Sequence, residues 1–464
     1  MQSNRDDKLQ QALPLLEQLL GDRVTTAHAE RDRHGRGEAY HPAFPPDAVC
    51  FPRSTAEIAE ILRICHAIEL PVIAFGAGTS LEGHVAALHG GLSVDLSRMD
   101  AVLNVSAGDL DATVQAGVTR QQLNSYLRDT GLFFPVDPGA EATIGGMVAT
   151  RASGTNAVRY GTMRENVVRL TVVLADGRIL RTGSRAKKSA AGYDLTRLFV
   201  GSEGTLGIIT EITVRLHGRP ESEATAISAF PTTQAAVSAA ILIVQSGIAV
   251  ARMELVDANG IIASNKYSKT TFNETPTLFF EFHGTQVDVD DQAERVRKIV
   301  VEEGATDFVW ERDVEAREKL WHARHNLHYA ISNMRPGARL WGTDVCVPIS
   351  RLADCIARAL EDSREMPFYV AVVGHVGDGN FHVTYVVDPG KEDEMRAVGV
   401  LSERLVRHAI AADGTCTGEH GIGYGKIKYM EAEHGATAVD VMRTIKQALD
   451  PLNILNPGKI LPEG

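Results

Sequence analysis

Residues 71–84 read PVIAFGAGTSLEGH and join a short apolar run to a loop of glycines and other small residues. The apolar part, Pro71–Phe75, predicts a buried strand, and the loop Gly76–His84 leads to a second strand-like run at Gly90–Leu96. Successive backbone N–H groups in such a loop can surround phosphate oxygens. We therefore interpret Gly76–His84 as a candidate phosphate-binding loop between two strands.

Two familiar nucleotide-binding loops do not fit this stretch. The dinucleotide fingerprint needs a helix directly after its glycines, and the Walker loop needs Gly-Lys followed by Ser or Thr. Neither pattern is present, so NAD-dependent dehydrogenation is disfavoured. A surface turn would be the default for an isolated glycine-rich loop, but Thr143–Asn156 and Gly201–Thr210 are also made almost entirely of small residues. Such segments fill no core, and they let backbone lie close to a flat or polyanionic ligand.

A second candidate site lies in the segment GHVGDGNFH, residues 374–382. The flanking runs Tyr369–Val373 and Val383–Val387 predict two strands, and the glycines between them favour a tight chain reversal. Such a hairpin would bring His375 and His382 near each other. One histidine alone would usually cap a carbonyl group or face solvent, but a pair is harder to explain in that way.

The segment CTGEHG, residues 416–421, places Glu419 and His420 between glycines. This setting is too flexible for a helix and suits close approach to a ligand. Two imidazoles and one carboxylate, from His375, His382 and Glu419, make an open site for a catalytic divalent metal ion.

The composition indicates an acidic protein of more than one domain. The chain has 464 residues, whereas single cores stop growing at roughly 250–300 residues. A net charge of −12 argues against nucleic acid as a partner. Five scattered cysteines form no CxxC pair, so a disulfide framework is not expected and a reducing compartment fits.

No targeting or membrane-spanning pattern is recognised in the sequence. The opening residues MQSNRDD lack the apolar core of a signal peptide and the acid-free, arginine-rich pattern of a transit peptide. The most apolar window, Ala235–Val250, is shorter than the roughly 20 residues of a membrane span. We therefore expect a cytoplasmic protein that reaches a membrane, if at all, through a partner.

The region after residue 218 predicts a second domain. Its order of elements, β-α-β-β-α-β, is that of a ferredoxin-like fold. The elements expected are Thr225–Phe230, Thr232–Gln245, Val250–Leu255, Thr277–Phe282, Val287–Glu303 and Thr306–Trp310. A long helix is expected over Glu315–Met334, and a final helix over Ala436–Leu449.

These motifs together resemble a known flavoprotein family. Five segments together resemble the FAD-binding fold of the vanillyl-alcohol oxidase superfamily: Phe75–His84, Pro135–Gly161, Gly192–Leu195, Leu198–Thr210 and Asn456–Lys459. Three further segments resemble the FAD-linked D-2-hydroxy-acid dehydrogenases: Asp344–Ser350, Gly374–His382 and Cys416–Gly423. The resemblance is strongest to the D-lactate dehydrogenases whose acceptor is not NAD. The similarity extends over most of the chain.

The resemblance implies an α+β fold with three parts. Residues 1–218 would form a two-subdomain FAD-binding domain of the vanillyl-alcohol oxidase and p-cresol methylhydroxylase (PCMH) type. Residues 219–425 would form a ferredoxin-like, antiparallel-sheet cap that carries the substrate and metal sites. Residues 426–464 would form a helical segment that returns to the FAD-binding domain.

The resemblance also implies FAD bound without a covalent link, because the position of His84 after Gly83 is similar to that in the non-covalent members. The residues expected to contact FAD are Gly76, Ala77, Gly78, Thr79, Ser80, Gly83, His84, Pro138, Gly139, Thr143, Gly145, Gly146, Ala149, Ser153, Gly154, Tyr160, Gly161, Glu203, Gly204, Ile208, Ile209 and Asn456.

The implied chemistry is the oxidation of a D-2-hydroxy acid to a 2-oxo acid, with hydride passing to flavin N5. Arg324 takes the position that binds the substrate carboxylate, for which a planar guanidinium offers two hydrogen bonds. A Zn or Mn ion on His375, His382 and Glu419 would bind the substrate oxygens. His420, next to a ligand but not one itself, would contact the substrate and act as general base.

Several points stay open within this interpretation. D-2-Hydroxyglutarate or glycolate could replace D-lactate, although a dicarboxylate needs a further cationic partner. The electron acceptor is expected to be a cytochrome, a quinone or an electron-transfer flavoprotein, and the chain could form a homodimer. A binding or scaffold protein without flavin is the alternative from a different class; it would be colourless, whereas the enzyme would be yellow.

Overall fold

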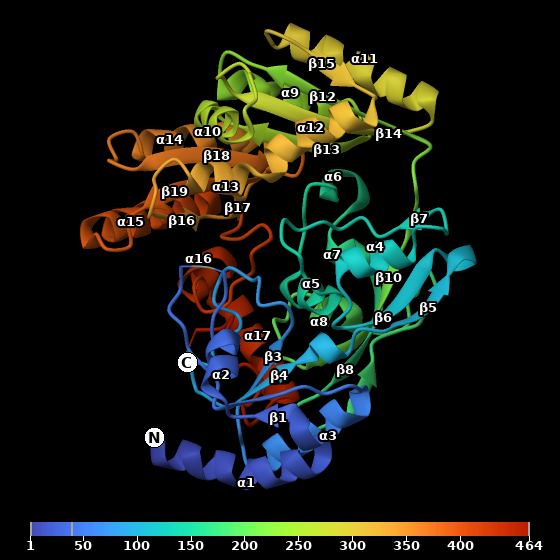
Figure 1. Ribbon diagram of the computed structural model, residues 1–464, viewed down its shortest axis with the longest axis vertical. Helices are drawn as coiled ribbons and strands as arrows, with labels where there is room; N and C mark the ends of the chain where they lie inside the picture. Colours follow the sequence, from blue (N-terminus) through green and yellow to red (C-terminus); the bar gives the residue numbers. More distant parts are fainter. Residues whose placement is uncertain (1, 39, 463–464) are drawn as a thin grey trace. The chain divides into compact units, whose positions relative to one another are not determined.

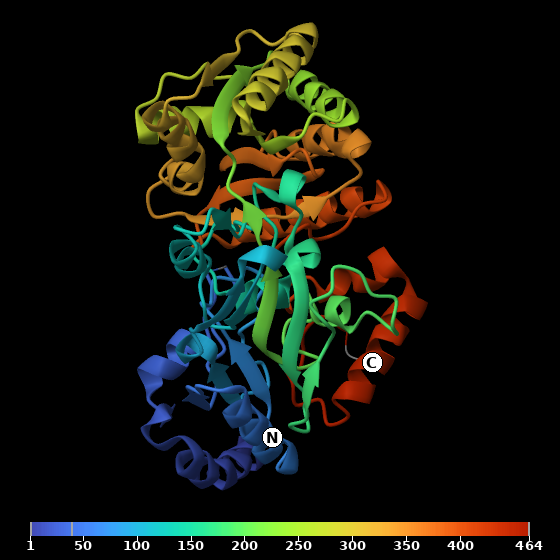
Figure 2. The same cartoon turned by 90° about the vertical axis from the view of Figure 1, so that its right-hand side faces the viewer.

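The computed structural model describes residues 2–38 and 40–462 and divides into two compact units. The first comprises the chain up to Ser153, Gly161–Arg219 and the chain from Glu419 onward. The second comprises Gly154–Tyr160 and Pro220–Gly418. Each unit combines sheets with helices, as expected for an α+β protein (Figures 1 and 2).

The glycine-rich loop of the first unit joins two neighbouring strands of a small sheet. This sheet has the order β1-β2-β4-β3, formed by Val24–Thr25, Ala48–Cys50, Leu92–Asp95 and Val72–Phe75. β3 and β4 are parallel, and the chain between them contains no helix. Helix α3 (Thr55–Ala67) begins after Ser54, because the side chain of Ser54 accepts a hydrogen bond from the backbone N–H of Glu57.

A second, antiparallel sheet completes the core of the first unit. Its order is β5-β6-β10-β8-β9, formed by Val102–Ser106, Asp111–Gln115, Ile208–Arg215, Val167–Val173 and Ile179–Arg181. Apolar residues of both sheets and of α3 form one continuous hydrophobic cluster. The chain after α17 (Ala436–Leu449) returns to this core, where the N–H of Val72 donates to the carbonyl of Ile454 at 2.7 Å.

One of the segments of small residues contains a helix. Residues Ile144–Thr150 form helix α5, which begins after Thr143 because its hydroxyl accepts from the N–H of Gly146. A Cβ at Gly145 would lie 2.6 Å from the Cβ of Ala116, so the small residue permits close packing of α5 on β6 and its neighbouring loop. Small side chains here serve helix packing as well as loop formation.

The second unit confirms the ferredoxin-like order and extends it. The core elements are β12 (Ser222–Ala229), α9 (Thr233–Gln245), β13 (Val250–Val256), β14 (Thr277–Gly284), α11 (Gln286–Glu302) and β15 (Val309–Glu311). A further helix, α10 (Ala258–Ser268), lies between β13 and β14. The sheet continues beyond β13 through β18 (Tyr369–His375), β19 (Asn380–Val387) and β16 (Arg339–Gly342), and β17 (Val345–Cys346) also pairs with β19.

Helices cover both faces of this sheet (Figure 2). The predicted helix Glu315–Met334 is in fact two helices, α12 (Val314–His325) and α13 (Leu327–Ser332), divided at Asn326. The break lets α12 bury Trp321 while α13 buries Leu327 and Ile331 in the same apolar cluster. Among the described residues, no helix combines the length and apolar character needed to cross a bilayer.

Candidate active site

The hairpin β18–β19 brings His375 and His382 together. The register pairs Val373 with His382, and His375 lies two residues further along β18, so both imidazoles lie on one face of the sheet. Their ring centroids are 5.5 Å apart. The turn requires glycine at Gly379, which has φ +78° and whose Cβ would lie 2.1 Å from the carbonyl oxygen of Val347.

The hydrogen bonds of the two imidazoles determine which ring nitrogen is available to a metal ion. Nδ1 of His382 lies 2.9 Å from the carbonyl oxygen of Thr343, and Nδ1 of His375 lies 2.7 Å from a carboxylate oxygen of Glu254. A carbonyl or carboxylate oxygen accepts, so each Nδ1 donates and Nε2 keeps the lone pair. This is the usual arrangement of metal-binding histidines, and the pair fits a divalent ion.

A buried polar cluster fixes the chain that precedes Glu419. Asp344 is fully buried and accepts hydrogen bonds from the side chains of Asn380 and Thr417, each at 2.7 Å. A Cβ at Gly418 would lie 2.1 Å from Nδ2 of Asn380, so this segment packs directly on the hairpin. Glu419 follows Gly418 by one peptide bond.

Arg324, on the buried side of α12, is held by Glu254 of β13. Nη2 of Arg324 donates to Glu254 at 2.5 Å, and the other carboxylate oxygen of Glu254 faces His375. Burial alone would raise the pKa of Glu254, but His375 and Arg324 outweigh it and lower the pKa below its usual value. Glu254 is therefore a buried anion shared by an arginine and a histidine.

Two further arginines on this face of the sheet are also paired with glutamates. Arg317 of α12 donates to Glu223. Arg252 of β13 lies 3.4 Å from Glu281 and stacks on Trp321 at 4.9 Å from the ring centroid. Neither guanidinium is left as an unbalanced charge.

In the first unit, the glycine-rich loop fits a phosphate-bearing cofactor. No backbone N–H from Ala77 to Gly83 donates a hydrogen bond to any residue that the structure describes. Such a series of donors suits the oxygens of a diphosphate, so the residues present fit FAD. A Cβ at Gly83 would lie 2.2 Å from the ring of Tyr424, so the loop also packs closely on the chain after His420.

Glu203, His84 and Asn456 connect this loop to two other segments. The carboxylate of Glu203 accepts from the backbone N–H groups of Ile422 and Gly423, at 2.7 and 2.8 Å. Nε2 of His84 lies 3.3 Å from Glu203. The side-chain amide of Asn456 donates to the carbonyl oxygens of Glu203 and His84, at 2.8 and 3.2 Å. These three predicted cofactor residues hold the loops against one another.

The other residues expected at the cofactor lie in several places. Thr143, Gly145, Gly146 and Ala149 belong to α5 or its cap, while Ile208 and Ile209 begin β10 and are buried in the hydrophobic cluster. Gly154 and Tyr160 fall in the second unit, where the hydroxyl of Tyr160 lies 2.8 Å from Nδ1 of His283. The remaining predicted residues lie in loops of the first unit or at its boundary, at Gly76–Ser80, Pro138–Gly139, Ser153, Gly161 and Gly204.

His420 faces a buried carboxylate within the first unit. Its Nδ1 lies 3.8 Å from Glu82, which is also 3.3 Å from Nζ of Lys426 and 3.6 Å from Nε2 of His41. Burial would raise the pKa of Glu82, but the charge of Lys426 and the hydrogen bonds from His41 and His420 outweigh it and hold the pKa well below its usual range. Glu82 therefore stays ionised beside the candidate base.

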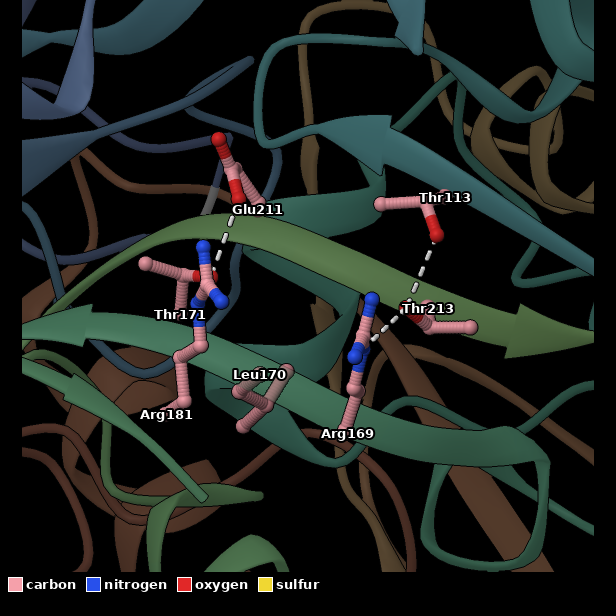
Figure 3. Close-up of a pocket in the computed structure, with 7 residues that line it drawn as sticks. All are labelled: Thr113, Arg169, Leu170, Thr171, Arg181, Glu211 and Thr213. Atoms are coloured by element: carbon pink, nitrogen blue, oxygen red, sulfur yellow. Dashed lines mark hydrogen bonds between the residues drawn. The ribbon is translucent and has the colours of Figure 1, made fainter. Parts of the chain in front are cut away.

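A separate hollow lies on the polar face of the second sheet of the first unit (Figure 3). It has a volume of about 80 Å³ and is lined by Arg169, Arg181, Glu211 and three threonines among others. Nε of Arg169 donates to Thr213, and Thr171 donates to Glu211. None of the residues predicted to act in catalysis or binding lines it.

Four residues of the site were not predicted from the sequence: Glu254, Asp344, Asn380 and Glu82. Glu254 is the single acidic residue of strand β13, which is otherwise mostly apolar. An acidic residue in such a run could have been recognised from the sequence as a candidate site residue. Asp344, Asn380 and Glu82 lay inside quoted motifs, but their roles depend on contacts between segments distant in sequence.

Comparison with known proteins agrees with these features. Residues 46–183 match the family described as "FAD binding domain", and residues 219–460 match "FAD linked oxidases, C-terminal domain". A probable mitochondrial D-lactate dehydrogenase of Danio rerio is 52% identical over 94% of this chain and 89% of its own length. The mitochondrial D-lactate dehydrogenase [cytochrome] of Arabidopsis thaliana is 45% identical over 96% of this chain and 79% of its own length.

A solved structure of p-cresol methylhydroxylase has the same fold. It aligns with a TM-score of 0.82 at 18% identity and covers 99% of this chain and 97% of its own. This likeness confirms the predicted PCMH-type α+β fold.

The expectation of a cytoplasmic location is wrong. Both relatives are named as mitochondrial proteins, which points to mitochondria instead. The expectation depended on a targeting pattern not being recognised, and an absence of that kind does not decide a compartment.

The comparisons also set aside a scaffold protein without flavin, since both halves of the chain match flavin-dependent families. On the strength of these matches, the chain belongs to the FAD-linked D-2-hydroxy-acid dehydrogenases of the vanillyl-alcohol oxidase superfamily, in the group that contains the D-lactate dehydrogenases.

Proposed function

We propose that the protein oxidises D-lactate to pyruvate and passes the electrons through FAD to a cytochrome-type acceptor rather than to NAD. The observation that carries this proposal is the cluster of Arg324, Glu254, His375 and His382 on one face of the second unit. It combines a carboxylate-binding guanidinium with two imidazoles prepared for a metal ion. Relatives named as D-lactate dehydrogenases support the substrate.

The charges around Arg324 favour a substrate with one carboxylate. Arg317 and Arg252 are already balanced by Glu223 and Glu281, so neither of these two described arginines is a spare cation for a second carboxylate. This favours D-lactate or glycolate over D-2-hydroxyglutarate. Desolvating an unpaired carboxylate of the longer acid would cost several kcal/mol.

We assign the residues as follows. Residues 1–218 and 426–464 bind FAD without a covalent link, and residues 219–425 cover the substrate. When bound, FAD supplies the hydride acceptor at N5. His375, His382 and Glu419 would hold a divalent Zn or Mn ion, which would supply Lewis-acid chemistry at the substrate.

The remaining steps belong to side chains. Arg324 binds the substrate carboxylate through its Nη1 donors and so fixes the orientation of the Cα–H bond. His420 accepts the hydroxyl proton, and the ionised Glu82 beside it stabilises the charge that the imidazole gains.

Acid precipitation should release the yellow chromophore into the supernatant, because FAD is not covalently linked.

A substrate and acceptor panel tests the proposal. Purified protein should reduce ferricytochrome c with D-lactate, more slowly with glycolate, and only weakly with D-2-hydroxyglutarate or L-lactate. NAD⁺ should not replace the cytochrome. A preference for D-2-hydroxyglutarate over D-lactate would contradict the proposal.

A further inference from the structure

Glu254 occupies a position in which both of its oxygens are used. It lies on β13 and is fully buried. One oxygen accepts from Nη2 of Arg324 at 2.5 Å, and the other accepts from Nδ1 of His375 at 2.7 Å. A single carboxylate thus connects helix α12 with strand β18.

The contact with His375 sets the orientation of that imidazole. Because Nδ1 donates to Glu254, Nε2 carries the lone pair that a metal ion needs. Carboxylate partners of this type fix the tautomer of metal-binding histidines, and their loss typically weakens metal binding by about 10- to 100-fold.

The contact with Arg324 uses one side of the guanidinium and leaves the other. The Nη1 group forms no hydrogen bond to a residue that the structure describes. A guanidinium held in this way by a buried carboxylate keeps one orientation, and its remaining donors can bind a second carboxylate.

We propose that Glu254 is the positioning residue that aligns the substrate-binding guanidinium with the metal-binding imidazole. The proposal rests on the proposed function, in which Arg324 binds the substrate carboxylate and His375 binds the metal ion. Glu254 itself touches neither substrate nor cofactor. Its role is to fix the distance between two groups that must engage one small molecule together.

The chain offers a matched control in Glu281. This residue is buried on the neighbouring strand β14 and is also shared by an arginine and a histidine, Arg252 and His283. Its partners have no assigned part in metal or substrate binding. A general effect of removing a buried glutamate should therefore appear equally in E254Q and E281Q.

The test uses FAD-loaded protein stripped of metal by a chelator. Zn²⁺ affinity is measured by equilibrium dialysis with metal analysis, and pyruvate affinity by the change in flavin absorbance in Zn²⁺-reconstituted protein. E254Q should bind Zn²⁺ about 10- to 100-fold more weakly and should also lose pyruvate affinity. E281Q should match the unmodified protein in both affinities.

If E254Q does not fold because Arg324 loses its counter-charge, the double variant E254Q/R324Q removes both charges and should still show the weak Zn²⁺ binding. Equal Zn²⁺ and pyruvate affinities in E254Q and E281Q would overturn the proposal. Unmodified protein that binds Zn²⁺ and pyruvate without oxidising D-lactate would refute the proposed function instead. In that case, the Zn²⁺ and pyruvate affinities of E254Q and E281Q would still test the role of Glu254.

Discussion

Arg324 is the residue whose replacement should affect substrate binding most directly. R324A should lower kcat/KM for D-lactate by the equivalent of about 2–5 kcal/mol, because it removes one partner of a buried charge pair. R324K should lose less but still raise KM, since an ammonium group cannot form two parallel hydrogen bonds. R317K, on the same helix and also paired with a glutamate, is the control and should leave KM unchanged. An unchanged KM in R324A would show that the substrate carboxylate binds elsewhere.

Glu419 and His420 should differ when each is replaced, although they are adjacent. E419Q should lose bound metal together with activity, because an amide is a weaker ligand than a carboxylate for a hard cation. H420A should retain metal and flavin but reduce the flavin about 10²- to 10⁴-fold more slowly. Metal analysis and stopped-flow absorbance measure the two effects. Metal-free H420A protein would reverse the assignment.

At the scale of elements, the N-terminus of α10 should make stability depend on pH. Asp257 caps this helix through the N–H of Gly260 at 2.7 Å, and burial raises its pKa from 3.8 to about 7. Between these values the folded state holds a proton that the unfolded state has released. The contribution of Asp257 to stability is therefore largest at low pH and falls as pH rises to about 7.

D257N keeps the capping oxygen but cannot ionise. The free energy of unfolding of D257N, relative to that of the unmodified protein, should increase between pH 5 and pH 8, because only the unmodified protein loses stability in this range; the upper limit is about 1.4 kcal/mol for each unit of pKa shift. Chemical denaturation at several pH values measures this difference. Parallel pH profiles for the two proteins would mean that Asp257 is ionised throughout.

The elements with strong local signals could be predicted from sequence, and those determined by packing could not. The glycine turn predicted the hairpin that brings His375 and His382 together. Helix α5 was not predicted, because its glycines give no helical signal and its position depends on contact with Ala116. Glu254 was missed because its partners lie 70 and 121 residues away along the chain.

At the scale of the whole chain, the C-terminal residues should control FAD retention. Asn456 donates to carbonyl groups in two separate loops, and net contributions of about 0.5–1.5 kcal/mol per hydrogen bond give an expected loss on the order of tenfold in FAD affinity for N456D. N104D, at an exposed position of β5, is the control. Flavin fluorescence on dilution measures the release. Equal FAD retention in N456D and N104D would show that FAD binding does not depend on the hydrogen bonds of Asn456.

The central claim is that the chain transfers the hydrogens of D-lactate to a bound flavin. The most direct measurement is the absorbance of the purified, oxygen-free protein after addition of one equivalent of D-lactate or L-lactate, with pyruvate quantified afterwards. D-lactate should bleach the yellow flavin and yield one pyruvate per flavin reduced, while L-lactate should leave the colour unchanged. A flavin that stays oxidised in D-lactate, or a protein without flavin, would contradict it.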